Sequence, residues 1–450
     1  MLVESGGHTL GAEAFTPVGS YLPVRFDAIV ATVLKDGVCV DRRNGTPMEM
    51  DAYSSYLAAK AHERAGLGAF REVRAALVRG IENRRQKCAG FWEHGAWTDL
   101  EGEIHLRFTA AAIRLLAEAH LDGLYPDTDA LLNCLRRHLA YADQLTIGTW
   151  FLHDSFETDA LGPLAPEKPV AARAWGASEY NCLVLNTHVD TLTTIICVLD
   201  QVTMSATERD ELSAVVRSAT RTLIASLTKR HSFGARAFGL LDGAVRSFML
   251  RTNHVDTRIV RFVRWRIIDY YYSARRGIKT SRMMLNFPDG YLERDLRLLG
   301  YHFDYHLYTL HDLVRFRSIA ANLEFIAGAE MAFLEDVIDA AIDYACRLPY
   351  RSWIEESVQQ NGRAALLCEA ILARASFAPQ FSFPRDWRDM FSAIIDHVPD
   401  TPGLLGYDPA IVSALVRRGD DRIFQLIDGT EVAVDAASRR PEVIRSLHHG

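Results

Sequence analysis

The chain has 450 residues, of which 49% are hydrophobic and 24% are charged, and this composition excludes a fibrous or largely disordered protein. Its 50 Lys and Arg residues are outnumbered by 57 Asp and Glu residues, which gives a net charge of −7. This balance argues against a general attraction to nucleic acid or to an anionic membrane, so that only local basic patches are left to consider.

The cysteines and the apolar runs indicate the compartment. The seven cysteines are widely spaced and include no Cys-x-x-Cys pair, so neither a structural zinc site nor a redox motif is predicted. The first residues lack the basic start and apolar core of a secretory signal, and no run approaches the roughly 18 apolar residues of a membrane span. We expect a reduced, cytoplasmic setting, no membrane span, and no metal or cofactor.

β-Hairpins are predicted near both termini. Residues 29–41 alternate between apolar and polar around an Asp-Gly pair, and residues 423–435 do the same around Asp428-Gly429.

From about residue 51 to residue 398, apolar positions recur every three or four residues, which is the period of amphipathic α-helices. About twelve helices are expected in this pattern and just after it. They cover approximately residues 54–66, 70–85, 105–123, 127–144, 182–201, 206–230, 235–251, 255–275, 305–325, 328–347, 361–376 and 408–417.

Such a series of helices can form a superhelical solenoid or a closed ring of helical hairpins, and the absence of a clear sequence repeat favours the ring. We therefore predict a mainly α fold, an (α/α) toroid over residues 51–400. Residues 1–50 would add a β-hairpin, and residues 401–450 a helix and a β-hairpin that pack on the toroid. The ends of inner helices line the cavity of a toroid, so polar clusters at helix starts are candidate sites.

Aromatic and acidic residues crowd the start of the helix predicted at 105–123. The indole face of Trp97 is a suitable platform for a sugar ring, and a carboxylate such as Glu101 could exchange a proton with a substrate. The alternative is structural, with the carboxylates stabilising the helix N-terminus and the indoles in the core.

Two polar side chains in the middle of the chain are further candidates. His153, in the segment WFLHDSFETD, could act as an acid or base, although this segment also suits a turn that caps the next element. Asn186 lies in a strongly apolar helix, where it is either a hydrogen-bonded core residue or a ligand-binding group that faces the cavity.

Residues 246–282 contain ten Lys or Arg and only two acids, against the sign of the whole chain. Arg261 and Trp265 are one helical turn apart, an arrangement suited to binding carboxylate or sulfate groups with aromatic stacking. A solvated basic face is the alternative, and RNA binding ranks lower because the chain is acidic and has no RNA-binding motif.

The segment 288–312 is the richest in titratable side chains. Arg294 could clamp a carboxylate, Tyr301 could contact the substrate, and Tyr305 with His306 at a helix start could exchange a proton with a substrate carbon. His302 and His306 are one turn apart, but the Glu of a His-Glu-x-x-His zinc motif is absent, which favours a metal-free site.

Two short motifs carry a family resemblance. One is an Asp-Tyr-His run ahead of a Leu, and the other is a Val-Leu-Asn start followed by a Leu six residues after the Asn. The residues are Asp304, Tyr305, His306 and Leu313 for the first motif, and Val184, Leu185, Asn186 and Leu192 for the second. Residues 90–320 thereby resemble the toroidal domain of D-glucuronyl C5-epimerases. The chain departs from that family at Thr309, where the family has a second His, and at Thr187, where it has Gly.

The resemblance implies uronate chemistry on a polysaccharide, in which a base removes the C5 proton and an acid returns one to the opposite face. We therefore expect an epimerase-like or lyase-like enzyme that acts on an anionic oligo- or polysaccharide, binds no nucleic acid, and leaves homo-oligomerisation open. Its candidate residues are Tyr305, His306, His153 and Glu101 for catalysis, and Asn186, Arg261, Arg294, Trp97 and Tyr301 for substrate binding.

Two alternatives remain at this point. One is a toroidal glycoside hydrolase, in which two of Asp99, Glu101, Asp154 and Glu157 would lie roughly 5–9.5 Å apart across a cleft. The other is a non-catalytic helical scaffold or ligand-binding protein, whose polar clusters would share no cavity.

Overall fold

The chain is mainly helical, with small antiparallel sheets. The computed structural model describes residues 49–64, 68–87, 90–93, 103–158, 160, 180–228, 233–252, 255–276, 285–296, 303–320, 323, 326–347, 350–357, 363–377, 382–395, 411–418, 420–435 and 441–445. The hairpin predicted over residues 29–41 lies outside these ranges, as does the rest of the predicted N-terminal unit up to residue 48.

The helices are α2 (Glu49–Arg64), α3 (Arg71–Lys87), α4 (Leu106–Leu121), α5 (Thr128–Leu139), α6 (Leu185–Gln201), α7 (Ala206–Leu227), α8 (Phe233–Arg251), α9 (Arg258–Arg276), α10 (Phe303–Ala320), α11 (Gly328–Cys346), α12 (Tyr350–Ser357), α13 (Arg363–Phe377) and α14 (Arg385–Ile395), with a 3-10 turn at Ser155–Glu157. The strands are β1 (Ala142–Leu145), β2 (Gly148–Phe151), β3 (Val412–Arg418), β4 (Asp421–Leu426), β5 (Glu431–Val434) and β6 (Pro441–Arg445). Among the helices that the structure describes, none is long and apolar enough to cross a membrane.

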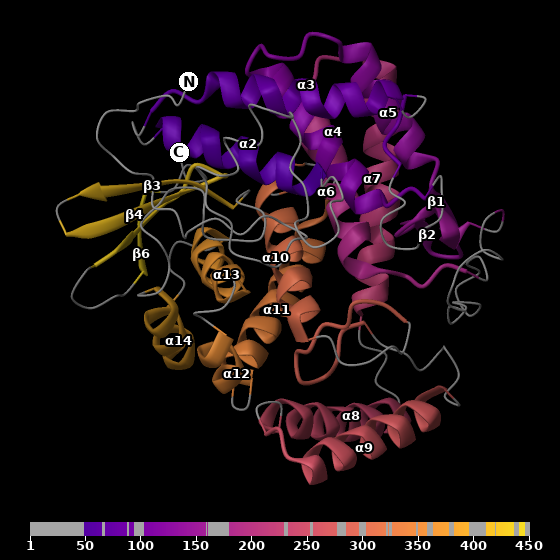
Figure 1. The fold of residues 1–450 in the computed structure, drawn as a ribbon, viewed down its shortest axis with the longest axis vertical. Helices are drawn as coiled ribbons and strands as arrows, with labels where there is room; N and C mark the ends of the chain where they lie inside the picture. Colours follow the sequence, from indigo (N-terminus) through magenta and orange to yellow (C-terminus); the bar gives the residue numbers. More distant parts are fainter. Residues whose placement is uncertain are drawn as a thin grey trace.

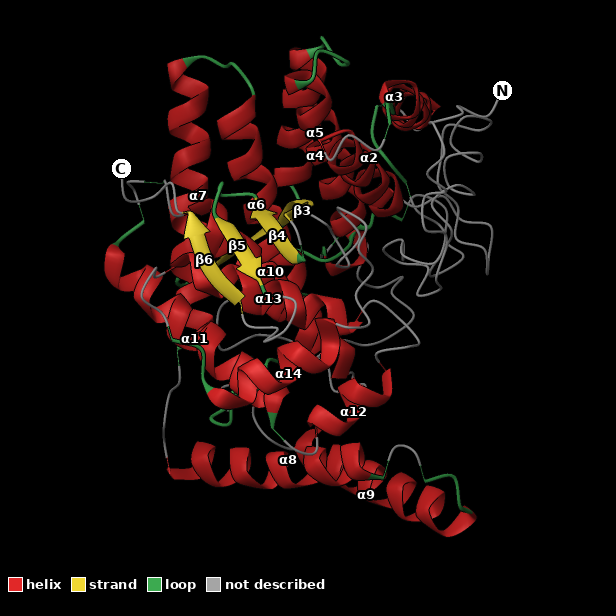
Figure 2. Cartoon of the chain, turned by 90° about the vertical axis from the view of Figure 1, so that its left-hand side faces the viewer, coloured by secondary structure: helices red, strands yellow, loops and turns green. Residues whose placement is uncertain are grey.

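Helices that follow one another in the chain pack in pairs, and the first members of these pairs also contact one another. The pairs are α2 with α3, α4 with α5, α6 with α7, α10 with α11, and α13 with α14. Helix α4 contacts α2 and α6, and α10 contacts α6 and α13, so that α2, α4, α6, α10 and α13 form a continuous series (Figure 1). The sheet β3–β4–β5–β6 touches both ends of this series, α2 through β3 and α13 through β6 (Figure 2).

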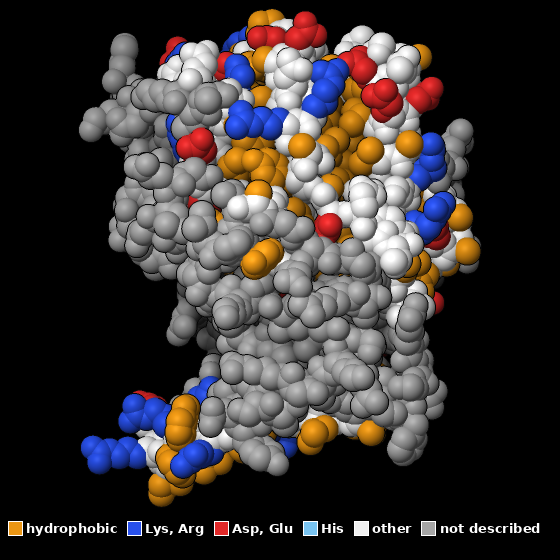
Figure 3. Space-filling view, turned by 90° about the vertical axis from the view of Figure 1, so that its right-hand side faces the viewer, with side chains coloured by type: hydrophobic (Ala, Val, Ile, Leu, Met, Phe, Trp, Pro, Cys, Tyr) orange, Lys and Arg blue, Asp and Glu red, His pale blue; other side chains and the backbone are white. Residues whose placement is uncertain are grey.

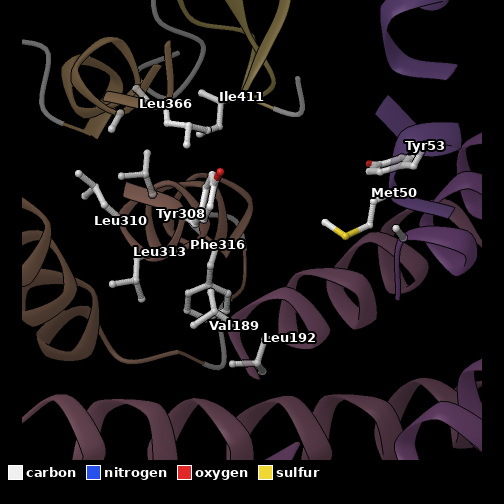
Figure 4. Close-up of a cluster of buried hydrophobic side chains, with 14 of the residues drawn as sticks. Met50, Tyr53, Val189, Leu192, Tyr308, Leu310, Leu313, Phe316, Leu366 and Ile411 are labelled. Carbon is white, nitrogen blue, oxygen red and sulfur yellow. The ribbon is translucent and has the colours of Figure 1, made fainter. Parts of the chain in front are cut away.

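The core lies between these central helices. Nearly every residue of α4 and α6 is buried, as expected for helices enclosed by other helices on all sides. Figure 4 shows part of this core, with Val189 and Leu192 of α6, Phe316 of α10, Leu366 of α13 and Ile411 at the start of the sheet. Because α10 is packed on both α6 and α13, its first turn has a fixed position relative to that of α6.

Five charged side chains are buried together between α4, α6 and α10. Arg107 makes a two-pronged ion pair with Asp312, with N–O distances of 2.6 and 3.0 Å, and Arg114 pairs with Asp190 at 2.8 Å. Arg315 contacts both carboxylates, and all five residues are at most 3% exposed. Burial alone raises the pKa of the Asp190 carboxyl, but the surrounding guanidinium groups outweigh burial and bring that pKa below its usual range.

The C-terminal region differs from the sequence prediction in one element. A helix was expected at residues 408–417, but Val412–Arg418 form the strand β3, which pairs antiparallel with β4. The run VSALVRR suits a helix or a strand by its own composition, and pairing with the neighbouring strand decides between them. The hairpin around Asp428-Gly429 is confirmed, because β4 and β5 pair across that turn.

Two further differences concern short elements. The helix expected at residues 127–144 ends as α5 at Leu139, and its last part forms β1, which pairs with β2. Helices α12 and α14 were not predicted. Helix α12 has only eight residues, too few for the apolar period to be distinctive. The apolar residues of α14, which are Trp387, Met390, Phe391, Ile394 and Ile395, do follow the helical period, so the sequence contains a signal for this helix.

The buried ion pairs predict a stability difference. Replacing Asp190 with Ala removes the carboxylate that pairs with the buried guanidinium groups of Arg114 and Arg315. This loss should lower the free energy of unfolding by about 3–5 kcal/mol. Denaturant unfolding followed by circular dichroism measures this loss. Asp389→Ala is the matched control, since Asp389 pairs with Arg385 at the exposed surface of α14, and it should leave the unfolding midpoint unchanged. Equal effects of the two substitutions would contradict the prediction.

Candidate functional site

His153 is fixed beside the first turn of α4 by its own backbone. His105 forms a β-bridge with Asp154, and the Leu106 amide donates to the His153 carbonyl at 2.9 Å. The Glu157 carboxylate accepts the His153 amide at 2.7 Å. The His105 and His153 rings meet edge to face with 4.4 Å between their centroids. The backbone of this segment thus sets where the His153 imidazole lies.

Arg294 is fixed beside the first turn of α6. The Leu185 amide donates to the Arg294 carbonyl at 2.8 Å, and the Leu296 amide donates to the Cys182 carbonyl at 2.9 Å. Leu183 lies between these contacts with φ +52°, the one positive φ at a non-glycine residue in the described ranges. This left-handed conformation is unfavourable for leucine and persists where the surrounding contacts enforce it, as they commonly do at functional sites.

The side chains of His153 and Arg294 meet at this point. A terminal nitrogen of Arg294 lies 3.2 Å from His153 Nε2, and His153 Nδ1 lies 2.7 Å from Thr187 Oγ1. Because a guanidinium can only donate hydrogen bonds, Nε2 is the acceptor and the proton of the neutral ring is assigned to Nδ1. The Arg294 guanidinium also lies over the Tyr305 ring, 4.5 Å from its centroid. A basic nitrogen, a cation and a phenol are thereby gathered between the starts of α6 and α10.

The cluster has an accessible side. The Arg294 side chain is 18% exposed, and Tyr305 is half-buried, whereas His153 is buried. Arg294 Nε also lies 3.5 Å from a carboxylate oxygen of Asp295, which holds the guanidinium from its other edge. A ligand that approaches from solvent would meet the guanidinium and the phenol ring before the imidazole.

Two buried histidines, His188 and His306, bind backbone amides that lie two residues before His153 and Arg294 in the chain. His188 Nδ1 accepts the Phe151 amide at 3.1 Å, and its Nε2 donates to a carbonyl of α7 at 3.1 Å. His306 Nδ1 accepts the Leu292 amide at 3.0 Å, and its Nε2 donates to a carbonyl of α11 at 3.1 Å. The His188 ring stacks on Trp150, and the His306 ring stacks on Tyr291. Both rings are neutral structural links.

His306 therefore does not fit the catalytic role predicted for it. Both ring nitrogens are bound to backbone groups, and burial lowers the pKa of this histidine to about 3. Neighbouring residues on a helix point about 100° apart, so Tyr305 and His306 project to different sides of α10. His153, together with Arg294, takes the place beside Tyr305 that the prediction gave to His306.

The other predicted residues are distributed as follows. Asn186 lies in the same turn of α6 as Thr187 and is buried, and its side-chain oxygen accepts the Thr187 amide at 3.0 Å. Arg261 is exposed on α9, where it pairs with Asp256 at 3.1 Å, and the structure does not bring it to the cluster. The predicted residues Trp97, Glu101 and Tyr301 lie outside the described residues.

Two of the four carboxylates considered for the hydrolase alternative, Asp154 and Glu157, accept hydrogen bonds from backbone amides. Asp154 accepts the Phe156 amide at 2.9 Å and so caps the 3-10 turn. The two oxygens of Glu157 accept the amides of His153 and Cys182, at 2.7 and 3.1 Å. Asp99 and Glu101 lie outside the described ranges. Within those ranges, no group of three or more His, Cys, Asp or Glu side chains is placed to hold a metal ion.

Three residues of the site were not predicted. Thr187 orients His153, His105 packs on its ring, and Leu183 holds the strained backbone between the two loops. Thr187 directly follows the candidate residue Asn186, and this position is the nearest signal for it in the sequence. No pattern in the sequence marks Leu183, whose amide donates to the Asn181 side chain at 2.8 Å and whose neighbours Cys182 and Leu185 bond to the segment around Arg294.

A cavity of about 970 Å³ lies at the opposite ends of the same helices. It is lined by the C-terminal turns of α4, α6 and α10, by the first turns of α7, and by the β4–β5 turn at Asp428-Gly429. Arg114 and Arg315 of the buried ion pairs form part of its wall. The buried ion pairs therefore lie along the helices between this cavity and the His153 cluster.

The neutral histidines predict a pH dependence of stability. Burial lowers the pKa of both His188 and His306 from 6.5 to about 3. In the unfolded chain these histidines take up protons as the pH falls below about 6.5, whereas in the folded chain they do not. The free energy of unfolding should therefore decrease as the pH is lowered from about 6.5 to 3. Each histidine contributes a slope of about 1.4 kcal/mol per pH unit. Denaturant unfolding at a series of pH values measures how steeply the free energy of unfolding depends on pH. His188→Gln should reduce this slope by the contribution of one histidine, about 1.4 kcal/mol per pH unit. An unchanged slope would contradict the assignment.

Comparison of the chain with protein-family models, curated proteins and solved structures finds no match.

Proposed function

We propose that the chain is an enzyme that moves a proton at the carbon next to a substrate carboxylate, with His153, Arg294 and Tyr305 at its site. The observation that supports this is the 3.2 Å contact between a neutral His153 Nε2 and the Arg294 guanidinium, with the Tyr305 ring on the same guanidinium. The proposed substrates are uronic acid residues of an anionic oligo- or polysaccharide, in keeping with the motifs around Asn186 and Tyr305.

A cation beside a base is what this reaction requires. A hydrogen on the carbon next to a carboxylate is weakly acidic, because the electron pair it leaves must spread into a group that is already negative. A guanidinium that binds both carboxylate oxygens compensates the added charge, and such charge-assisted pairs are strong. Arg294 would supply this compensation, and because the guanidinium lies 3.2 Å from His153 Nε2, a carboxylate that binds it would be brought close to the base.

The proposed reaction has two steps. His153 Nε2 takes the C5 proton, and the C–H electron pair moves into the carboxylate, giving an enediolate bound to Arg294. In the epimerase version, the Tyr305 hydroxyl gives its proton to the opposite face of C5. In the lyase version, the electron pair forms a C4–C5 double bond and expels the C4 oxygen, which takes the Tyr305 proton. In both versions, a water molecule then accepts the proton of the His153 imidazolium and gives one to the Tyr305 phenolate, which restores both groups.

The packing of the helices supports an (α/α) toroid as the frame for this site. The central helices contact one another in chain order, and the C-terminal sheet touches both the first and the last of them, which favours a closed ring. His105, Thr187 and Tyr305 belong to the starts of three of these helices. In a ring these starts would face one mouth, where a polymer could bind.

Hydrogen exchange tests the proposed chemistry. In D₂O, incubation with a uronate polysaccharide should place deuterium at C5 or should generate unsaturated ends that absorb in the ultraviolet. His153→Gln and Tyr305→Phe should each reduce the rate by about 10²–10⁴-fold, because each removes a transferable proton or its acceptor. Arg294→Ala should weaken substrate binding in a salt-dependent way, and Arg294→Lys should recover only part of it.

Arg261→Ala is the matched control, because it removes an exposed arginine that the structure does not bring to the cluster. It should leave the exchange rate unchanged. If Tyr305→Phe and His153→Gln retain full activity on a polymer that does exchange, the site is wrong. If a panel of uronate polymers of different linkage shows neither exchange nor cleavage, the reaction is wrong.

A further inference from the structure

Exposed apolar side chains are concentrated on one helical pair. Of the eight large apolar side chains that are exposed in the described part of the chain, six lie on α8 and α9. They are Leu240 and Leu241 on α8, and Ile259, Phe262, Val263 and Trp265 on α9. The two helices lie side by side at one end of the molecule (Figures 1 and 2). A concentration of this kind on an otherwise well-packed protein indicates an interaction surface.

Helix α8 has one face bound to the body and the other exposed. On its inner face, Arg246 pairs with Asp242 and with Asp289, the latter at 2.7 Å, and lies 4.2 Å from the centroid of the Tyr291 ring. Leu240, on the outer face, is 78% exposed. Helix α8 is therefore held to the rest of the protein by buried contacts on one face, while the leucines on its other face are exposed to solvent.

Helix α9 combines apolar and basic side chains on its exposed face. Counted from Arg258, the side chains of Phe262, Trp265 and Arg266 follow after four, seven and eight residues, so the four residues share one face of the helix. All four are exposed. The Arg266 guanidinium lies over the Trp265 ring, 4.8 Å from its centroid. The first ten residues of α9 contain four arginines and no acid. Figure 3 shows basic and hydrophobic side chains gathered at this projecting end of the molecule.

We propose that the α8–α9 pair docks the protein on an anionic lipid bilayer surface. Helices with arginines among Trp, Phe and Leu lie in the plane of the headgroups, where the apolar side chains enter the acyl boundary and the cations face anionic lipids. The chain carries a net charge of −7, so an anionic surface repels most of the molecule and attracts this end. The docked orientation is therefore set by charge. The proposal is independent of the reaction at His153.

Two other occupants fit the observations less well. A soluble anionic polysaccharide would match the arginines and Trp265, but largely exposed aliphatic side chains such as Leu240 and Ile259 gain little from contact with hydroxyl-rich sugars. A second copy of the chain, packed face to face, would bring the arginines of α9 against their own equivalents. An anionic bilayer offers negative headgroups to the arginines and an apolar layer below them to the exposed apolar side chains, so it can bind both kinds of side chain.

Vesicle sedimentation of the full chain tests the proposal. The protein should bind phosphatidylcholine vesicles that contain phosphatidylglycerol, bind vesicles of phosphatidylcholine alone much less, and dissociate at high salt. Arg258→Gln with Arg266→Gln should weaken binding roughly 25-fold, since each arginine near an anionic surface contributes roughly fivefold. Phe262→Ser with Trp265→Ser should weaken it at least about tenfold. The tryptophan emission should shift to the blue on anionic vesicles, and Trp265→Phe should remove that shift.

Matched controls come from exposed residues elsewhere. Leu121 at the end of α4 is 60% exposed, and Arg385 on α14 is also exposed, so Leu121→Ser and Arg385→Gln should leave vesicle binding unchanged. Equal binding by the α9 variants and the wild type would overturn the proposal. The proposal would also be overturned if the wild type bound a soluble polyuronate but no vesicles, and the α9 variants lost the polyuronate binding. A change from dimer to monomer in the variants, again without vesicle binding by the wild type, would identify a second copy as the occupant.

Discussion

The buried ion pairs between α4, α6 and α10 constrain the rest of the structure. Three guanidinium groups and two carboxylates have been removed from water there, and such groups are stable only when each finds its partner in good geometry. A shift of one helix by a single residue along its axis would separate them. The three helices are thereby fixed in register, and their first turns, which contact His153, Arg294 and Tyr305, are fixed with them.

The site is built from two similar units. In α6 and in α10 the fourth residue is a buried histidine that binds the amide of a preceding loop and a carbonyl of the following helix. The residue before each histidine contacts the cluster, as Thr187 bonds to His153 and Tyr305 lies under Arg294. The same arrangement therefore occurs twice, and the two loops that it fixes carry His153 and Arg294. The two helix starts share the run His-x-x-Thr-Leu, at residues 188–192 and 306–310, and the structure shows that both histidines make the same kind of backbone contacts.

The sequence alone predicted more of the fold than of the site. The apolar period gave the helices, and the Asp-Gly turn gave the β4–β5 hairpin, because both depend on local patterns. It also selected His153, Arg294 and Tyr305 as candidates, but it could not show that His306 is bound on both nitrogens or that Arg261 is on a separate face. His306 bonds to Leu292 and Ala341, which are 14 and 35 residues away along the chain, and such tertiary partners are not encoded in the local apolar pattern.

The contact between Arg294 and His153 has a consequence for specificity under the proposed reaction. Without substrate, the guanidinium donates to Nε2, which is the lone pair that would remove the proton. A substrate carboxylate accepts hydrogen bonds from arginine more strongly than a neutral imidazole does, since it is charged. Its arrival would draw the guanidinium away and free Nε2 at the moment when the acidic carbon is in place. A neutral sugar could not compete for the guanidinium, so the same contact that positions the base would also keep it inactive toward substrates without a carboxylate.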